Sequence, residues 1–102
     1  MAEVIWTEPA LNDLDEIADY IALDKPAAAA RLVQRVFAAV GRLEKFPESG
    51  RVPSELRGLV YREVVVAPCR VFYRRADDVV YILFVMRAEK QLSKELLEER
   101  NL

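Results

Sequence analysis

The chain has 102 residues, of which 53% are hydrophobic and 31% are charged, and it contains one cysteine and no histidine. This length is close to the lower limit for a self-sufficient core, so two independent domains are excluded and one domain over residues 1–102 is predicted. Cys69 has no partner for an intramolecular disulfide, and a chain without histidine lacks the ligands of an ordinary zinc site. We therefore expect neither a metal nor a cofactor.

Hydropathy gives no indication of a membrane protein. The longest strongly apolar run, residues 79–86, has eight residues, whereas a helix needs roughly 20 to cross a bilayer. The first nine residues carry no lysine or arginine, unlike the basic start of a secretory signal. These features predict a cytoplasmic protein with no membrane partner.

The net charge of −2 is the sum of two unequal halves. Residues 1–50 hold 9 acidic and 5 basic side chains (net −4), and residues 51–102 hold 8 acidic and 10 basic ones (net +2). Within residues 51–75 the net charge is +4, because two glutamates face six arginines: Arg51, Arg57, Arg62, Arg70, Arg74 and Arg75. Since a guanidinium binds phosphate and carboxylate through a planar fork, this segment is a candidate binding surface.

The first half of the chain predicts a short strand followed by two helices. Residues 3–6 form the strand, Thr7 is a plausible N-cap, and Asp24 with Pro26 starts the second helix. Apolar residues of the first helix recur on one face: Leu11, Leu14, Ile17 and Ile21. Its acidic residues, Asp13, Asp15, Glu16 and Asp19, lie mostly on the opposite face and predict a solvated surface rather than a metal site.

After a loop over residues 51–58 the hydrophobic period changes from 3.6 to 2. Residues 60–66, 70–75 and 79–86 predict three strands, and their short connections favour an antiparallel meander. A final amphipathic helix, about residues 89–99, presents Leu92, Leu96 and Leu97 to a partner. The predicted fold is α+β, β-α-α-β-β-β-α, with the N-terminal helical hairpin packed on one face of an antiparallel sheet and the other face partly open.

Two interpretations of the strand arginines follow from this fold. In the first, Arg62, Arg70 and Arg87 converge on a concave anion site. In the second, they pair with Glu55, Glu63 or backbone carbonyls and support the structure. A Ser-His-Asp triad is excluded in either case, because the chain has no histidine.

An ordered set of short motifs points to a known family. It comprises Trp6-Thr-Glu-Pro-Ala10, Asp13-Leu14, Phe46-Pro47, Gly50-Arg51, Arg62-Glu63, Arg70-Val-Phe-Tyr-Arg74, Ile82-Leu83 and Arg87. The set resembles the RelE/ParE superfamily, the toxins of bacterial type II toxin–antitoxin systems, over nearly the whole chain. The resemblance implies the same element order that the periodicity predicts.

The superfamily divides into two activities. ParE-like members block DNA gyrase without a catalytic step, and RelE-like members cleave messenger RNA on the ribosome. This chain has no histidine, no lysine in residues 47–58 and no tyrosine after Tyr81, and its pI is about 5.2. These features favour a ParE-like, non-enzymatic toxin that arrests growth and is neutralised by a cognate antitoxin in a hetero-oligomeric complex.

The resemblance also implies roles for particular residues. The expected antitoxin contacts are Leu92, Leu96 and Leu97, and the expected gyrase contacts are Arg51, Arg57, Arg62, Arg70, Arg74 and Arg87. In the RelE-like alternative the partners are the ribosome and mRNA, and Arg62, Arg70 and Arg87 stabilise the cleaved phosphate. Cys69 and Met86 stand where the family often has tyrosine and histidine, which leaves open a third alternative, an inactive relative that only binds the antitoxin.

Overall fold

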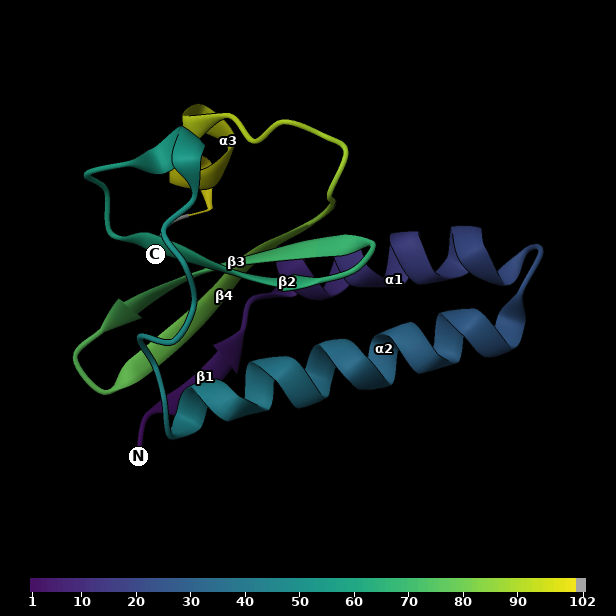
Figure 1. The fold of residues 1–102 in the computed structure, drawn as a ribbon, viewed down its shortest axis with the longest axis horizontal. Coiled ribbons are helices and arrows are strands. Elements are labelled where there is room, and N and C mark those ends of the chain that lie inside the picture. The colour runs from purple at the N-terminus through teal and green to yellow at the C-terminus, as the bar shows by residue number, and fades with distance from the viewer. Residues whose placement is uncertain (101–102) are drawn as a thin grey trace.

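A computed structural model describes residues 1–100. Its elements follow the predicted order β-α-α-β-β-β-α, which confirms the α+β class (Figure 1). They are β1 (Glu3–Trp6), α1 (Glu8–Ala22), α2 (Pro26–Gly41), the 3-10 turns η1 (Arg42–Glu44) and η2 (Ser54–Leu56), β2 (Tyr61–Val66), β3 (Cys69–Ala76), β4 (Val79–Arg87) and α3 (Lys94–Glu99).

The four strands form one sheet in the order β1-β4-β3-β2. Strands β2, β3 and β4 make the predicted antiparallel meander. Strand β1 joins beside β4 in parallel, with Glu3 opposite Val79 and Trp6 opposite Ile82, so the sheet is mixed. A parallel neighbour is possible here because the helical hairpin, β2 and β3 lie between β1 and β4 in the chain and supply the long connection that parallel strands require.

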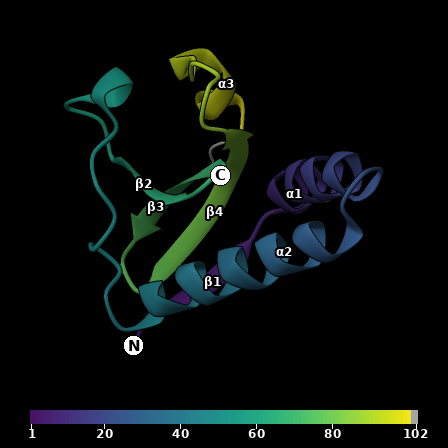
Figure 2. The ribbon, with the colours of Figure 1, turned by 45° about the vertical axis from the view of Figure 1, so that its right-hand side comes forward.

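The helical hairpin covers one face of the sheet (Figures 1 and 2). Thr7 joins the two layers, because its hydroxyl accepts from the Ala10 N–H at the start of α1 and donates to the Ile82 carbonyl at 2.7 Å. Leu11, expected in the buried stripe of α1, is exposed. The core between hairpin and sheet includes Leu14, Leu32, Val36, Val40, Val71, Tyr73 and Ile82.

The opposite face of the sheet is covered at its centre, so the expectation of a partly open face was wrong there. Turn η2 and helix α3 pack on it and bury a second cluster. Its members are Leu56, Tyr61, Phe72, Leu83, Met86, Leu92 and Leu97. The side chains of β3 alternate between the two faces: Phe72 faces this cluster, whereas Val71 and Tyr73 face the helical hairpin.

Helix α3 begins at Lys94, later than the predicted start at residue 89. The Ser93 hydroxyl accepts from the Leu96 N–H at 3.1 Å and caps the helix. The Leu92 N–H instead donates to the Glu55 carboxylate at 3.5 Å. With this N–H bound to Glu55 and Ser93 as the cap, α3 runs only from Lys94 to Glu99.

The Tyr73 hydroxyl anchors the turn that follows α2. It accepts from the Gly50 N–H at 2.9 Å and donates to the Pro47 carbonyl at 3.0 Å. A Cβ atom on Gly50 would lie 2.5 Å from the Tyr73 hydroxyl oxygen and 2.8 Å from the Glu63 carbonyl oxygen. Glycine is therefore required at residue 50 by close approach of side chain and backbone.

An ion-pair network holds the second face together. Arg70 on β3 donates through Nε to Glu63 at 2.7 Å and through both terminal nitrogens to Glu55 at 2.9 Å. Glu63 also accepts from Arg51 Nε at 3.2 Å. Since Glu55 accepts from the Leu92 N–H as well, the network joins β2, β3, η2 and the segment before α3.

Substitution of Gly50 tests the Tyr73 anchor. We expect Gly50→Ala to lower the free energy of unfolding by about 2 kcal/mol or more, because the methyl group must displace Tyr73 or the Glu63 carbonyl. Gly41→Ala is the matched control, since its Cβ would meet nothing within 4 Å. It should be neutral or stabilise by roughly 0.5 kcal/mol. Urea unfolding measures both, and equal stabilities of the two variants would contradict the anchor.

Acid should weaken the Arg70 network. The hydrogen bonds from Arg70 lower the pKa of Glu55 from 4.5 to about 2. Because the pKa of Glu55 is lower in the folded state than in the unfolded state, its carboxylate stabilises the fold above about pH 4.5. This stabilisation is lost as the pH falls toward 2. We therefore expect Glu55→Gln to lower the free energy of unfolding by about 2 kcal/mol at pH 7, with the difference from the parent shrinking between pH 5 and pH 2. Urea unfolding across this pH range measures it, and a pH-independent difference would contradict the network.

Candidate functional site

The structure does not bring Arg62, Arg70 and Arg87 together. Arg62 lies opposite Tyr73 and Arg87 opposite Cys69, so both project toward the helical hairpin, whereas Arg70 projects to the other face. Side chains of a strand alternate between the faces of a sheet, and this parity separates Arg62 from Arg70. The predicted concave anion site of these three arginines is not assembled.

Each of these three arginines has a partner within the chain. Arg70 is buried in the network with Glu55 and Glu63, and Arg62 donates to the Gly50 carbonyl at 2.9 Å. The structural interpretation of the strand arginines is therefore confirmed for Arg62 and Arg70. Arg87 pairs with Glu89 at 2.8 Å, and its guanidinium lies 6.0 Å from the ring of the exposed Tyr20.

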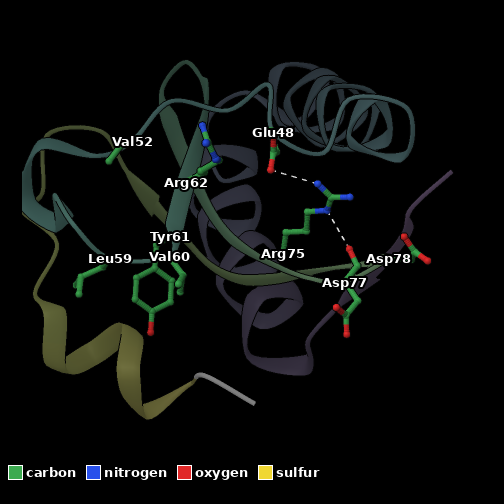
Figure 3. A pocket seen from close by; sticks show the side chains of 9 residues that line it. All are labelled: Glu48, Val52, Leu59, Val60, Tyr61, Arg62, Arg75, Asp77 and Asp78. Carbon is green, nitrogen blue, oxygen red and sulfur yellow. Dashed lines mark hydrogen bonds and ion pairs between the residues drawn. The ribbon is translucent and has the colours of Figure 1, made fainter.

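A cleft of about 770 Å³ lies beside Arg62, between the loop before β2 and the turn between β3 and β4 (Figure 3). Arg75 crosses it, donating to the Glu48 carboxylate at 3.2 Å and to the Asp77 carbonyl at 2.9 Å. The full lining is Glu48, Val52, Leu59, Val60, Tyr61, Arg62, Arg75, Asp77 and Asp78. The cleft contains three carboxylates and two guanidinium groups, so its charge does not favour a phosphate. It fits a ligand that presents both polar and apolar groups better.

The remaining predicted target contacts differ in exposure. Arg57 is exposed on the loop after η2, and the Arg51 side chain is 68% exposed although its Nε binds Glu63. The Arg74 guanidinium lies 5.3 Å from the ring of Tyr81. The arginines that present the most surface to a large partner are therefore Arg51 and Arg57, both close to η2.

Two groups that could act in nucleophilic attack or proton transfer, the Cys69 thiol and the Tyr73 hydroxyl, are buried. Burial raises the pKa of the Cys69 thiol and of the Tyr73 hydroxyl, and the Tyr73 hydroxyl already binds Gly50 and Pro47. Across residues 1–100, no group of three or more His, Cys, Asp or Glu side chains could hold a metal ion. None of the helices in this described part is long and apolar enough to span a membrane.

The three leucines predicted to contact an antitoxin are not equivalent. Leu92 and Leu97 are 6% and 0% exposed and belong to the core of the second face. Leu96 is 43% exposed and borders a groove of about 320 Å³ that Ile17, Phe84 and Met86 also line. Leu96 is thus the one leucine of the three that offers apolar surface to another molecule.

Asp13 and Arg100 have structural roles that the sequence pattern does not indicate. Asp13, expected on a solvated helix face, accepts from the Val85 N–H at 3.0 Å and forms an ion pair with Arg100. The Arg100 guanidinium lies 3.9 Å from the centre of the Phe84 ring. This contact joins α1, β4 and the residue after α3, and no local pattern could indicate it because the residues are far apart in the chain.

A family model described as the ParE toxin of the type II toxin–antitoxin system parDE matches residues 4–92. Among solved structures, the chromosomal ParDE toxin–antitoxin system from P. aeruginosa superposes with a TM-score of 0.74 at 28% identity. That comparison covers 87% of this chain and 98% of the other.

Three curated relatives are similar over most of their length. The putative toxin Y4kP of Sinorhizobium fredii is 47% identical, covering 84% of this chain and 88% of the relative. Toxin RelE2 of Caulobacter vibrioides is 40% identical (88% and 99% covered), and toxin ParE3 of the same species is 34% identical (94% and 96% covered). The match over residues 4–92 and these full-length similarities show that the chain belongs to the ParE toxin family of type II toxin–antitoxin systems.

Proposed function

We propose that this ParE-family toxin inhibits DNA gyrase in the cytoplasm by binding it, without a catalytic step, and that a cognate antitoxin neutralises it. The observation that carries the proposal is the family match over residues 4–92. It is supported by a relative named ParE3, whose similarity covers 94% of this chain.

The positions of the arginines and the contacts they already make within the chain argue against the RNA-cleaving alternative. Stabilising a phosphate transition state requires preorganised donors aimed at the developing charge. Arg62 and Arg70 lie on opposite faces, and Arg70 already donates to Glu55 and Glu63. A general acid for the leaving oxygen is also needed, yet the chain has no histidine and Cys69 is buried. The RNA-cleaving alternative is favoured by one observation, the 40% identity to a relative named RelE2.

We assign the contacts with gyrase to the exposed arginines. Arg51 and Arg57, which present the most surface, and the partly exposed Arg87 at the end of β4 can each meet an acidic protein surface or DNA. Arg70 would contribute indirectly, since its network positions η2 and the loop that carries Arg57.

A gyrase supercoiling reaction with the antitoxin-free toxin tests the proposal. We expect inhibition with accumulation of cleaved DNA. Arg57→Glu and Arg87→Glu should each weaken inhibition by about tenfold or more, because charge reversal replaces attraction by repulsion at the interface. Arg31→Glu, an exposed arginine on α2, is the matched control and should inhibit like the parent.

Other outcomes separate the alternatives. A folded toxin that arrests growth without affecting gyrase, while cellular mRNA is cut at codon-dependent positions, would establish the RelE-like activity instead. A folded protein that is harmless in cells but still binds the antitoxin would be an inactive relative. Full inhibition by the Arg57→Glu, Arg87→Glu double variant would overturn the assignment of these contacts.

We assign one antitoxin contact to Leu96. Leu96→Ser should weaken antitoxin binding about fivefold or more, since it removes apolar surface beside the groove at Ile17 and Phe84. The melting temperature of the Leu96→Ser toxin should remain near that of the parent. Leu97→Ser is the comparison: Leu97 is fully buried, so this change should destabilise the fold. Titration calorimetry and thermal unfolding measure the two effects, and unchanged affinity of Leu96→Ser would refute the contact.

A further inference from the structure

The two helices of the hairpin carry opposite charge. Helix α1 contains five acidic residues and neither lysine nor arginine, whereas α2 contains two arginines and no acidic residue. Arg42 follows α2 directly and keeps helical backbone angles. Three exposed acids of α1 and three exposed arginines along α2 each form a row. The acidic row is Glu8, Asp15 and Asp19, and the basic row is Arg31, Arg35 and Arg42.

Neither row is neutralised within the described part of the chain. None of the ion pairs there includes a member of either row, and Arg35 binds only the Ala67 carbonyl, at 2.8 Å. Asp15 and Asp19 are like charges four residues apart, as are Arg31 and Arg35, and this spacing destabilises a helix. These four residues also lie outside the helix turns in which their charge would favour the helix dipole. The rows therefore do not serve their own helices and remain available to a partner.

The two rows have the same spacing, read in opposite directions. After Glu8 the acids follow at intervals of seven and four residues, and before Arg42 the arginines precede it at the same intervals. Both intervals keep side chains on one face of a helix, about 10 and 6 Å apart along its axis. An antiparallel contact that sets Glu8 beside Arg42 therefore brings all three acid–arginine pairs into register. The other two pairs are Asp15 with Arg35 and Asp19 with Arg31.

The two rows of one chain do not meet each other. The basic row lies toward the β2 side of α2, because Arg35 binds the Ala67 carbonyl between β2 and β3 and Arg42 borders a hollow that Val65 also lines. The hairpin itself lies on the outside of the molecule, with the sheet on its inner side (Figure 2). A two-fold axis along the hairpin lays α1 of one copy antiparallel to α2 of the other. Symmetry then makes the same contact twice.

Uncharged residues between and beside the rows allow close approach. Leu11 on α1 is 37% exposed, Phe37 on α2 is 43% exposed, and the exposed Ala38 lies between two arginines of the basic row. Two helices about 24 Å long and about 10 Å wide offer roughly 500 Å² of each copy. A standard stable interface covers about 800 Å² per partner, so we expect a weak, reversible contact.

We propose that the toxin forms a two-fold dimer through the outer face of its helical hairpin, with the acidic row of each copy against the basic row of the other. A second copy accounts for both rows. An acidic protein segment would use only the basic row, and the phosphates of duplex DNA would be repelled by the acidic row on the adjacent helix. Arg57 and Arg87, which we assign to gyrase, belong to neither row, so this inference goes beyond the proposed function.

Charge reversal on one row tests the contact. In sedimentation equilibrium of the antitoxin-free toxin at low salt, we expect a dimer with a Kd on the order of 100 µM. The Arg31→Glu, Arg35→Glu variant should raise the Kd about tenfold or more, because four attractive pairs in each dimer become repulsive. The matched control is Arg57→Glu, Lys90→Glu, which makes the same change in charge at exposed residues outside the hairpin and should dimerise like the parent.

A reciprocal variant separates loss of the contact from loss of the fold. Asp15→Lys, Asp19→Lys gives both helices of the hairpin basic rows, and Arg31→Glu, Arg35→Glu introduces acids into both. Neither variant should associate with itself. An equimolar mixture should form a heterodimer with a Kd within about threefold of the parent, because each α1–α2 contact again joins opposite charges. Raising the ionic strength to about 0.5 M should weaken both the parent dimer and this heterodimer.

The outcomes are distinct from those of the gyrase test. A wild-type toxin that stays monomeric at several hundred micromolar, or folded variants that do not associate when mixed, would overturn the dimer. So would parent-like dimerisation of Arg31→Glu, Arg35→Glu, which would assign self-association to another surface. If the wild-type toxin is monomeric and this variant loses binding to duplex DNA or to the antitoxin, the basic row belongs to that partner instead. Inhibition of gyrase by the wild-type toxin is measured separately and decides the proposed function alone.

Discussion

The buried Arg70 guanidinium is the constraint on which the second face of the sheet depends. A charge at this depth is tolerated only when it is paired and hydrogen-bonded, so Glu55 and Glu63 must both stay in place. Turn η2 has three residues and α3 has six, too few for either to be stable in isolation. Through Glu55, the network fixes η2 and the segment before α3 over the apolar cluster around Phe72 and Leu97.

This constraint links the fold to the surface available for function. An arginine-rich segment suggests a binding site, but Arg62 and Arg70 are engaged with the chain's own carbonyl and carboxylates. The exposed Arg57 lies on the loop whose position the network sets. A toxin that acts by binding gains from such an arrangement, because a preorganised loop loses less conformational entropy when it meets its target.

The strand edges on the two sides of the sheet are protected differently. Beyond Ile82, β4 has no β1 neighbour, and side chains close this edge: Asp13 accepts from the Val85 N–H, and Arg100 donates to the Leu83 carbonyl at 3.4 Å. On the other side, Arg51 covers β2 only at Glu63. Exposed strand edges are templates for pairing with another chain. The two edges are therefore closed by different means, by side chains at Val85 and by backbone pairing at Glu63.

Local sequence patterns determined most of the architecture. Hydrophobic period, the cap at Thr7 and the short connections between strands predicted the element order and the antiparallel meander, because these signals involve residues close together in the chain. Only the tertiary structure showed four further features. These are the parallel pairing of β1 with β4, the packing of η2 and α3 on the second face, the start of α3 at Lys94 and the Asp13–Arg100 contact. Each depends on residues far apart in sequence meeting across the sheet, as Glu55 meets both Arg70 and Leu92. The same reason explains the arginines: only the packed structure showed that Arg62 and Arg70 project to opposite faces and that the protein itself binds both guanidinium groups.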